Sequence, residues 1–330
     1  MTEALANDDI SSVFKHSLEK IIQAKKEITK VIIGQDEVVD QTLITLLAGG
    51  HVLLIGVPGL AKTLLVETIA TALGLDANRV QCTPDLMPAD ILGSEVLEED
   101  ESGKRSFRFI KGPIFTQLLM ADEINRASPR TQSALLQSMQ EKEVSISGKA
   151  HDLPKPFHVM ATQNPIEQEG TYPLPEAQLD RFLMQVNVDY PTLEAEREVI
   201  LKTTTNEMPK ATQVMDADEL MDVQRLVRDM PVGESVVDMI VNLVRNLRPG
   251  EDASEQVNEY VTWAPGPRGS QGLMLAVRAR ALLEGRSAPI EEDVFALAAP
   301  VLRHRMALNF KARSQGMELD ALIDEVAKNL

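Results

Sequence analysis

The fold of this chain is predicted by one stretch, His51-Val52-Leu53-Leu54-Ile55-Gly56-Val57-Pro58-Gly59-Leu60-Ala61-Lys62-Thr63. An apolar run typical of a strand ends at Gly56, a turn with Pro and Gly follows, and a helical pattern begins at Lys62. Strand, loop and helix in this order are the context of a phosphate-binding loop. The alternative, a Gly/Pro turn before an unrelated helix, is disfavoured because all three parts agree.

The side chains of this loop indicate a nucleotide as the ligand. The pattern G-x-x-x-x-G-K-[ST] is met, except that Ala61 stands where the last glycine is usual. Its methyl group is tolerable if the φ angle there is negative, which makes the departure mild. Lys62 is expected to reach the β- and γ-phosphates, and the Thr63 hydroxyl to be a ligand of Mg²⁺.

The composition is that of a soluble globular protein, with 44% hydrophobic and 25% charged residues among 330. This length favours two domains of roughly 150 residues each. The single cysteine, Cys82, excludes a disulfide within the chain and fits a reducing compartment. The stretch from Met1 to Ser12 lacks the apolar segment of a signal peptide, and no apolar run approaches the ~20 residues of a membrane span. We therefore expect a cytoplasmic protein without a membrane span.

The net charge of −17 argues against nucleic acid as the partner. Binding to a phosphate backbone is driven largely by Lys and Arg, whereas here 50 acidic residues outnumber 33 basic ones. Local basic patches could still line a pore, so nucleic acid is unlikely rather than excluded. The plainest interpretation of the charge is a well-solvated surface.

Residues 1–190 alternate between strand and helix patterns and predict an α/β P-loop domain with a parallel, five-stranded sheet. Two hairpin-like insertions interrupt it, one at 91–110 around a polar turn at 98–104 and one beginning at Val144. Tyr190-Pro191-Thr192 marks a boundary, beyond which we expect no buried strand. The remainder, 191–330, predicts an all-α lid domain with helices at 193–203, 220–230, 236–247, 273–283 and 294–302.

Asp122-Glu123 predicts the second half of a nucleotide site. The pair follows the apolar run Leu118-Leu119-Met120-Ala121, and a carboxylate at the end of a buried parallel strand faces the crevice where the loop also lies. Asp122 would hold Mg²⁺, directly or through water. Glu123 is then placed to polarise a water for attack on the γ-phosphate. An ordinary helix start is the alternative, and the context disfavours it.

Three further residues remain open on the sequence alone. Asn164 follows the next apolar strand and suits orienting a water, although an Asn before Pro is equally common in a turn. Arg181 precedes the last strand, and Arg268 begins a helix of the second domain. A guanidinium at the γ-phosphate can stabilise its transition-state charge, but an isolated Arg is normally a solvated surface group.

The chain resembles the AAA+ ATPases, and specifically the MoxR family, over about residues 33 to 310. The resemblance rests on these runs: Gly56-x-Pro58-Gly59-x-Ala61-Lys62-Thr63, Ala121-Asp122-Glu123-Ile124-Asn125-Arg126-Ala127, Ala134-Leu135-Leu136 with Met139-Gln140-Glu141, Ala161-Thr162-Gln163-Asn164-Pro165, and Leu174-Pro175-Glu176-Ala177-Gln178-Leu179-Asp180-Arg181-Phe182. The two hairpins match the insertions after helix 2 and before sensor 1 that mark this branch of the AAA+ proteins.

The resemblance assigns roles to the open residues. It implies that Ala61 is typical of the family, that Asn164 is the sensor 1 residue, that Arg181 is the arginine finger and that Arg268 is the sensor 2 arginine. Arg268 stands in Gly-Pro-Arg-Gly here, where Ser-Pro-Arg is commoner. The implied nucleotide contacts, of which the first two lie near the base, are Gly34, Gln35, Gly56, Pro58, Gly59, Leu60, Ala61, Lys62, Thr63 and Leu64.

The function that the resemblance implies is Mg²⁺-dependent ATP hydrolysis coupled to remodelling or activating a partner protein. It also implies a hexameric ring and a partner with a von Willebrand factor A domain. The nearest rival is the motor subunit of a metal chelatase, which shares the architecture. A nucleic-acid motor is disfavoured by the charge, and a small-molecule kinase by Glu123, which favours water as the acceptor. A module that only holds ATP remains open if Glu123 has no catalytic role.

Overall fold

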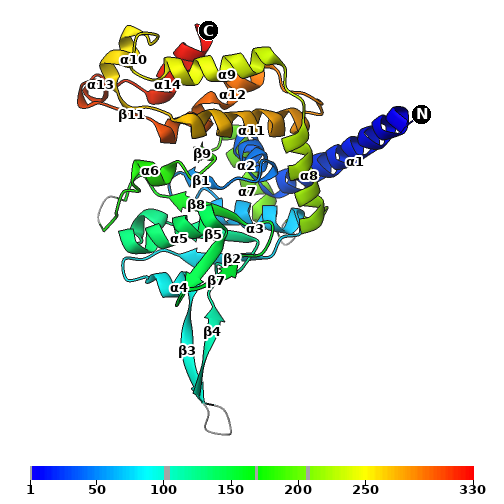
Figure 1. Ribbon diagram of the computed structural model, residues 1–330, viewed down its shortest axis with the longest axis vertical. Helices are drawn as coiled ribbons and strands as arrows, with labels where there is room; N and C mark the ends of the chain where they lie inside the picture. Colours follow the sequence, from blue (N-terminus) through cyan, green and yellow to red (C-terminus); the bar gives the residue numbers. More distant parts are fainter. Residues whose placement is uncertain (1, 100–104, 168–169, 206–208) are drawn as a thin grey trace.

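The computed structural model describes residues 2–99, 105–167, 170–205 and 209–330, with side chains described from residue 14 onward (Figure 1). A five-stranded sheet of order β2-β5-β8-β1-β9 forms its centre, and every pair in it is parallel. The predicted five-stranded parallel sheet is thus confirmed. Its strands are β1 (Val52–Ile55), β2 (Ala77–Gln81), β5 (Leu118–Asp122), β8 (His158–Gln163) and β9 (Met184–Asn187).

The three middle strands β1, β5 and β8 are buried on both faces, which explains their apolar runs, whereas the edge strand β2 is mostly exposed. In β1, Val52 and Leu54 belong to one apolar cluster, which also takes in the first helices and the second half of the chain. Leu53, which points to the opposite face, belongs to a second cluster that contains Leu135 of the helix after β5. Because parallel strands share a direction, the carboxyl ends of β1, β5 and β8 meet at one edge.

The patterns of the first half predict α1, α2, α3 and α5, whereas the short helices α4 and α6 were not predicted and α1 is longer than expected. The pattern from Phe14 predicts a helix ending near Val31, and the helix in fact begins at Thr2 and extends away from the body (Figure 1). None of the helices within the described ranges combines the length and the apolar character needed to cross a membrane. The helices of this half are α1 (Thr2–Val31), α2 (Asp36–Leu47), α3 (Lys62–Ala72), α4 (Pro88–Leu92), α5 (Pro129–Glu141) and α6 (Glu176–Leu179), with the 3₁₀ turn η1 (Ile124–Arg126).

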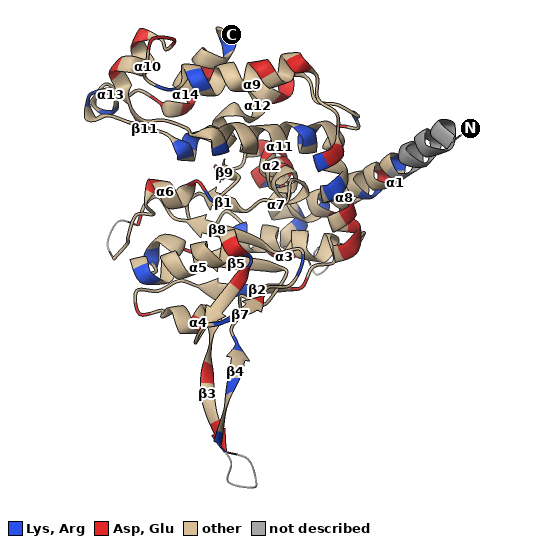
Figure 2. Cartoon of the chain, viewed as in Figure 1, with Lys and Arg blue, Asp and Glu red and all other residues tan. Residues whose placement is uncertain are grey.

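Two antiparallel hairpins interrupt this domain, as predicted. The first, β3 (Gly93–Glu99) with β4 (Arg105–Lys111), projects far from the sheet (Figure 1). Acidic residues lie on β3 and basic ones on β4 (Figure 2), and the ion pairs Arg105–Glu99 and Arg108–Glu98 join the two strands. Of the predicted polar turn 98–104, Glu98 and Glu99 belong to β3, and 100–104 lie outside the described residues. The second hairpin pairs β6 (Glu143–Ile146) with β7 (Lys149–Asp152), whose polar sequence gave no strand signal.

The second half is mostly helical, but it is not all-α. The predicted lid lacked strands, whereas Val261 and Leu308 belong to a small antiparallel pair. Its strands of three and two residues are too short to show a period of two in the sequence. The elements are α7 (Leu193–Thr203), α8 (Ala217–Asp229), α9 (Glu234–Asn246), α10 (Glu255–Tyr260), β10 (Val261–Trp263), α11 (Pro267–Leu283), α12 (Glu291–Leu302), η2 (Arg303–Arg305), β11 (Ala307–Leu308), α13 (Phe310–Ser314) and α14 (Leu319–Lys328).

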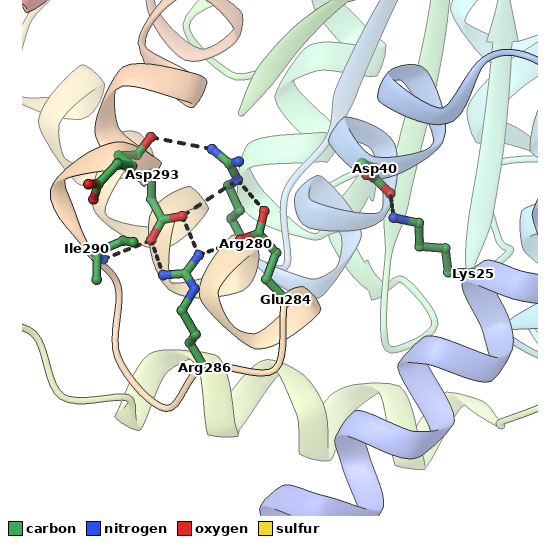
Figure 3. Close-up of polar contacts among 8 residues, drawn as sticks. Lys25, Asp40, Arg280, Glu284, Arg286, Ile290 and Asp293 are labelled. Atoms are coloured by element: carbon green, nitrogen blue, oxygen red, sulfur yellow. Dashed lines mark hydrogen bonds and ion pairs between the residues drawn. The ribbon is translucent and has the colours of Figure 1, made fainter.

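A buried carboxylate fixes the corner between α11 and α12 (Figure 3). Asp293 is only 1% exposed, and both its oxygens accept hydrogen bonds of 2.7 Å from Arg286. Its Oδ2 also accepts from the backbone N–H of Ile290 at 2.9 Å. Because a buried carboxylate without partners is strongly unfavourable, these contacts hold the two helices at a fixed angle. The pair Lys25–Asp40, at 2.6 Å, ties α1 to α2 in the same view.

Candidate functional site

A pocket of about 410 Å³ opens at the edge of the sheet where β1, β5 and β8 end. It gathers the predicted residues of the loop, except Gly56, and of both later motifs, although they lie more than 100 positions apart in the sequence. The lining residues are Pro58, Gly59, Leu60, Ala61, Lys62, Thr63, Leu64, Asp122, Glu123, Thr162 and Asn164.

The loop is open at Gly59 and closely packed at Gly56. Gly59 has a φ of +86°, and a Cβ added to it would meet no atom within 4 Å, so the space over the loop is open. At Gly56 a Cβ would lie 2.5 Å from the carbonyl oxygen of Val188, which explains glycine at the end of β1. The condition of a negative φ at Ala61 is wrong, because its φ is +55°. The backbone of Ala61 is therefore in the left-handed region, which is strained for a residue with a Cβ, and such strain is typical of functional loops.

The ammonium group of Lys62 lies over the loop. Its Nζ donates to the carbonyl oxygens of Gly56, at 2.5 Å, and Val57, at 2.8 Å. Partial burial lowers the pKa of Lys62, while the charges of Asp122 and Glu123 act in the opposite direction. The ammonium group thus has two backbone acceptors and lies within the electrostatic influence of two carboxylates.

Asp122 is the last residue of β5, and the neighbouring strands hold both its oxygens. Thr162, near the end of β8, donates its hydroxyl to Oδ1 at 2.5 Å. Arg79 of β2 lies 2.5 Å from Oδ2. The sequence interpretation named neither partner. Thr162 lies at the end of the same apolar run that precedes Asn164. Because this run forms the strand next to β5, its position was the signal in the sequence that could have identified Thr162.

Glu123 has a left-handed backbone, with φ +55°, at the turn between β5 and η1. Its amide N–H donates to the Thr162 hydroxyl at 2.8 Å. Gln81 and Arg126 both hold the carboxylate through Oε2, at 2.8 and 3.0 Å. Gln81 was missed as well, because its relation to Glu123 arises from the pairing of β2 with β5, which sets Gln81 opposite Asp122.

Asn164 is 5% exposed, and it has features of both alternatives left open by the sequence, a turn residue and a residue of the site. Its Oδ1 accepts from the amide of Ile166 at 3.1 Å, as an Asn in a turn does. The side chain also lines the pocket beside Lys62 and Glu123. With the oxygen engaged, the amide NH₂ is the group left to contact a ligand.

The donor set of the pocket fits Mg²⁺. The hydroxyl of Thr63 and the carboxylate of Asp122 both line it, and hard oxygen donors of this kind are the protein ligands that Mg²⁺ takes alongside phosphates and water. Since Thr162 and Arg79 already occupy the oxygens of Asp122, the carboxylate would approach the ion through water or after exchanging a partner.

A second pocket, of about 290 Å³, is lined by both residues expected near the base, Gly34 and Gln35. Gln35 joins the two pockets, because its Nε2 lies 3.4 Å from the carbonyl oxygen of Leu60 in the loop. Gly34 has a φ of +69°, and a Cβ on it would lie 2.2 Å from that of Ala195 in α7. The other lining residues are Asp36, Glu37, Val38, Gln41, Asn187, Asp189, Tyr190, Arg303 and Asp320.

Arg268 lies beside the segment that carries Arg181. Arg181 donates from Nε to Gln140 of α5 at 3.1 Å. Arg268, at the start of α11, lies 3.7 Å from Asp180, the residue just before Arg181. The structure thus brings Arg268 next to the residue that precedes Arg181, and neither arginine is among the described residues that line the loop pocket.

Comparison with known proteins agrees with this geometry. Residues 51–184 match the model of the ATPase family associated with various cellular activities (AAA), and 254–326 match that of the AAA lid domain. Chaperone MoxR1 of Mycobacterium tuberculosis is 43% identical over 316 residues, which cover 96% of this chain and 82% of that protein. The chain belongs to the MoxR family of AAA+ ATPases.

Two more relatives support the MoxR assignment. Protein MoxR of Methylorubrum extorquens is 31% identical over 301 residues, or 86% of either chain. Among solved structures, a Cytophaga hutchinsonii protein assigned as an ATPase superposes with a TM-score of 0.89 at 35% identity, covering 100% of this chain and 99% of that one. The fold of that solved structure therefore matches this chain over its whole length, and proteins named Chaperone MoxR1 and MoxR are among its relatives.

Proposed function

We propose that the chain hydrolyses ATP with Mg²⁺ in the loop pocket and uses the free energy to remodel or activate a partner protein. The observation that carries this proposal is the meeting of Lys62, Thr63, Asp122, Glu123 and Asn164 in one pocket of about 410 Å³. Phosphoryl transfer to water needs a cation at the phosphates, oxygen ligands for a metal ion, a second carboxylate as proton acceptor and a group that orients the water.

Each residue has a distinct task in this proposal. Loop N–H groups and Lys62 bind the β- and γ-phosphates, and Mg²⁺ held by Thr63 and Asp122 neutralises part of their charge. Glu123, fixed through Oε2 by Gln81 and Arg126, accepts the proton of the attacking water on its other oxygen. Asn164 orients that water through its NH₂ group. The base lies in the adjoining pocket beside Gly34 and Gln35.

The two arginines are proposed to act on the site of a neighbouring subunit. Arg181 as the finger and Arg268 as the sensor 2 residue fit a ring better than a self-contained enzyme, because both lie outside the loop pocket of their own chain. The family resemblance supports a hexamer and a partner with a von Willebrand factor A domain, and the relative's name, Chaperone MoxR1, supports a chaperone-like role. The single cysteine supports a cytoplasmic location.

The test separates binding from hydrolysis. Glu123→Gln should bind ATP with wild-type affinity in calorimetry and lose phosphate release by at least about 100-fold, because an amide cannot accept a proton. Lys62→Ala should weaken ATP binding itself, by roughly 10- to 100-fold, as one cation facing two phosphates is lost.

The matched control is Glu141→Gln, which removes a carboxylate from the exposed end of α5 and should leave both measurements unchanged. Normal turnover in Glu123→Gln would assign the proton acceptor elsewhere. Unchanged ATP affinity in Lys62→Ala would reject the loop as the phosphate site.

A further inference from the structure

One buried guanidinium joins the second half of the chain to the segment that carries Arg181. Arg305, in η2 directly after α12, has a side chain that is only 4% exposed. All five of its N–H donors find oxygen acceptors, which is the full capacity of an arginine. Apart from the carbonyl of Val301 in α12 and the ring Nε2 of His304, every acceptor lies in residues 180–183, between α6 and β9.

The contacts lie on both sides of Arg181. Arg305 Nε donates to Asp180 Oδ1 at 2.7 Å, and Nη2 reaches the carbonyl of the same residue at 3.3 Å. On the other side, Nη2 donates to the carbonyl of Phe182 at 2.7 Å, and Nη1 to that of Leu183 at 3.1 Å. The backbone of Arg181 is therefore held at its neighbours before and after.

The side chain of Arg181 is held far more weakly. Its hydrogen bond runs to Gln140, an exposed residue of α5, at 3.1 Å. The guanidinium of Arg305 is buried, and removing the partners of a buried charge costs several times more free energy than breaking one exposed hydrogen bond. When η2 moves, the segment 180–183 is expected to move with it rather than separate from it, and Arg181 follows.

Asp180 also connects this segment to the start of α11. Its Oδ1 is bonded to Arg305, while its Oδ2 lies 3.7 Å from Nη1 of Arg268. Two parts of the second domain, η2 and the first turn of α11, thus converge on the residue that precedes Arg181. If the contacts of Asp180 served only to anchor β9, contacts from both η2 and α11 would not be required.

We propose that Arg305 and Asp180 are positioning residues for Arg181, and that through them the lid of one subunit sets the finger offered to the next. This inference rests on the proposed role of Arg181 in a ring. It also states which part controls which. A nucleotide that moves the lid of one subunit moves its 180–183 segment, and Arg181 then acts on the site of the neighbouring subunit.

The experiment uses mixed rings of full-length subunits. A subunit with Glu123→Gln cannot hydrolyse ATP but can donate a finger, and a subunit with Arg181→Ala can hydrolyse ATP only with a borrowed one. Mixing the two, with differential tags to confirm mixed rings, should restore part of the ATPase activity. Adding Asp180→Asn to the donor should then reduce the restored activity by about 100-fold, the scale expected for a finger displaced by roughly 1 Å.

The reverse arrangement distinguishes positioning from general stability. Asp180→Asn in the Arg181→Ala subunit should leave the restored activity within about twofold, because that subunit offers no finger. Arg305→Lys in the donor, which keeps the charge and removes the planar fork, should repeat the donor defect. Asp252→Asn in the donor is the matched control, since it removes the carboxylate of an exposed lid pair, Arg245–Asp252.

Each result decides the question. A donor with Asp180→Asn that restores full activity overturns the positioning role. Equal losses in both arrangements mean a structural tie and overturn it as well. No recovery in the first mixture, with mixed rings confirmed, rejects the finger assignment of Arg181 itself and this inference with it.

Discussion

Two buried histidines lie under the site, where β1 and β8 begin. His158 is 1% exposed, its Nδ1 lies 2.8 Å from the carbonyl oxygen of Gly50, and its Nε2 lies 3.0 Å from the side-chain nitrogen of Gln224 in α8. Nδ1–H therefore donates and Nε2 accepts, which is the neutral form. His51 accepts the amide of Val159 on Nδ1 at 2.9 Å and is neutral too.

Because these histidines are buried, they make the free energy of unfolding depend on pH. Burial lowers the pKa of His158 to about 4 and that of His51 to about 3, and nearby Lys142 acts in the same direction on both. The folded pKa of His158 thus lies below the ordinary 6.5, so between pH 6.5 and 4 the unfolded chain binds more protons. Stability contributed by the neutral ring is present above pH 6.5 and is lost as the pH falls towards 4.

We predict that His158→Gln reduces the pH dependence of unfolding. The wild-type free energy of unfolding should fall by about 2 kcal/mol through His158 alone between pH 7.5 and 5.0, and the variant should lack that part of the decrease. Urea unfolding at the two pH values measures it. His16→Gln, at an exposed position of α1, is the control and should retain the wild-type dependence. An equal decrease in His158→Gln and in wild type would contradict the prediction.

Among the elements, the β3–β4 hairpin depends on two glycines at its base. A Cβ on Gly93, whose φ is +96°, would lie 2.2 Å from the carbonyl oxygen of Ile110. On Gly112 it would lie 2.2 Å from the carbonyl oxygen of Ile91 and 2.5 Å from the amide nitrogen of Gly93. These are backbone atoms, so neither strand has room to accept a side chain where the hairpin joins α4.

Gly112→Ala should therefore separate the base of the hairpin and lower the free energy of unfolding by roughly 1 to 3 kcal/mol, as overpacking does. Gly250→Ala is the matched control, because a Cβ there has only Arg248 O within 4 Å, at 3.9 Å, and its φ is not in the left-handed region. Denaturant unfolding of the two variants beside wild type gives the comparison. Equal stabilities for the two variants would show that the hairpin base adapts without loss.

At the scale of the whole molecule, the distribution of the site predicts an assembly that depends on nucleotide. The loop pocket and the two arginines lie at different places on one chain, and a ring would bring the arginines of one subunit to the pocket of the next. A nucleotide between subunits would add contacts to both, and binding to the assembled state shifts the equilibrium towards it.

ATP with Mg²⁺ should thus convert the free chain into a species of about six times its mass in sedimentation velocity, in line with the family resemblance. Glu123→Gln, which retains ATP, should assemble at lower ATP concentration than wild type, and Lys62→Ala should not respond to ATP. A monomer at every ATP concentration, at high protein concentration, would count against a ring.

The local parts of this protein follow from its sequence. A few consecutive residues specify each of three local features: the loop from Gly56 to Thr63, the Asp122-Glu123 pair and the buried strands β1, β5 and β8. This is so because a turn, a helix start or a buried strand depends on its own side chains. Parallel strands then bring their carboxyl ends to one edge, which is why the loop and the carboxylates were predicted to meet.

The contacts between distant segments were decided only by the tertiary structure. Arg79, Gln81 and Thr162 became partners of the carboxylates through strand pairing, and the left-handed backbone of Ala61 through the fit of the loop at the end of β1. The enclosure of Arg305 by residues 180–183, more than 120 positions earlier, had no local signal at all. A hydrogen bond across that distance depends on where two elements pack, and packing is a property of the whole chain rather than of any stretch in it.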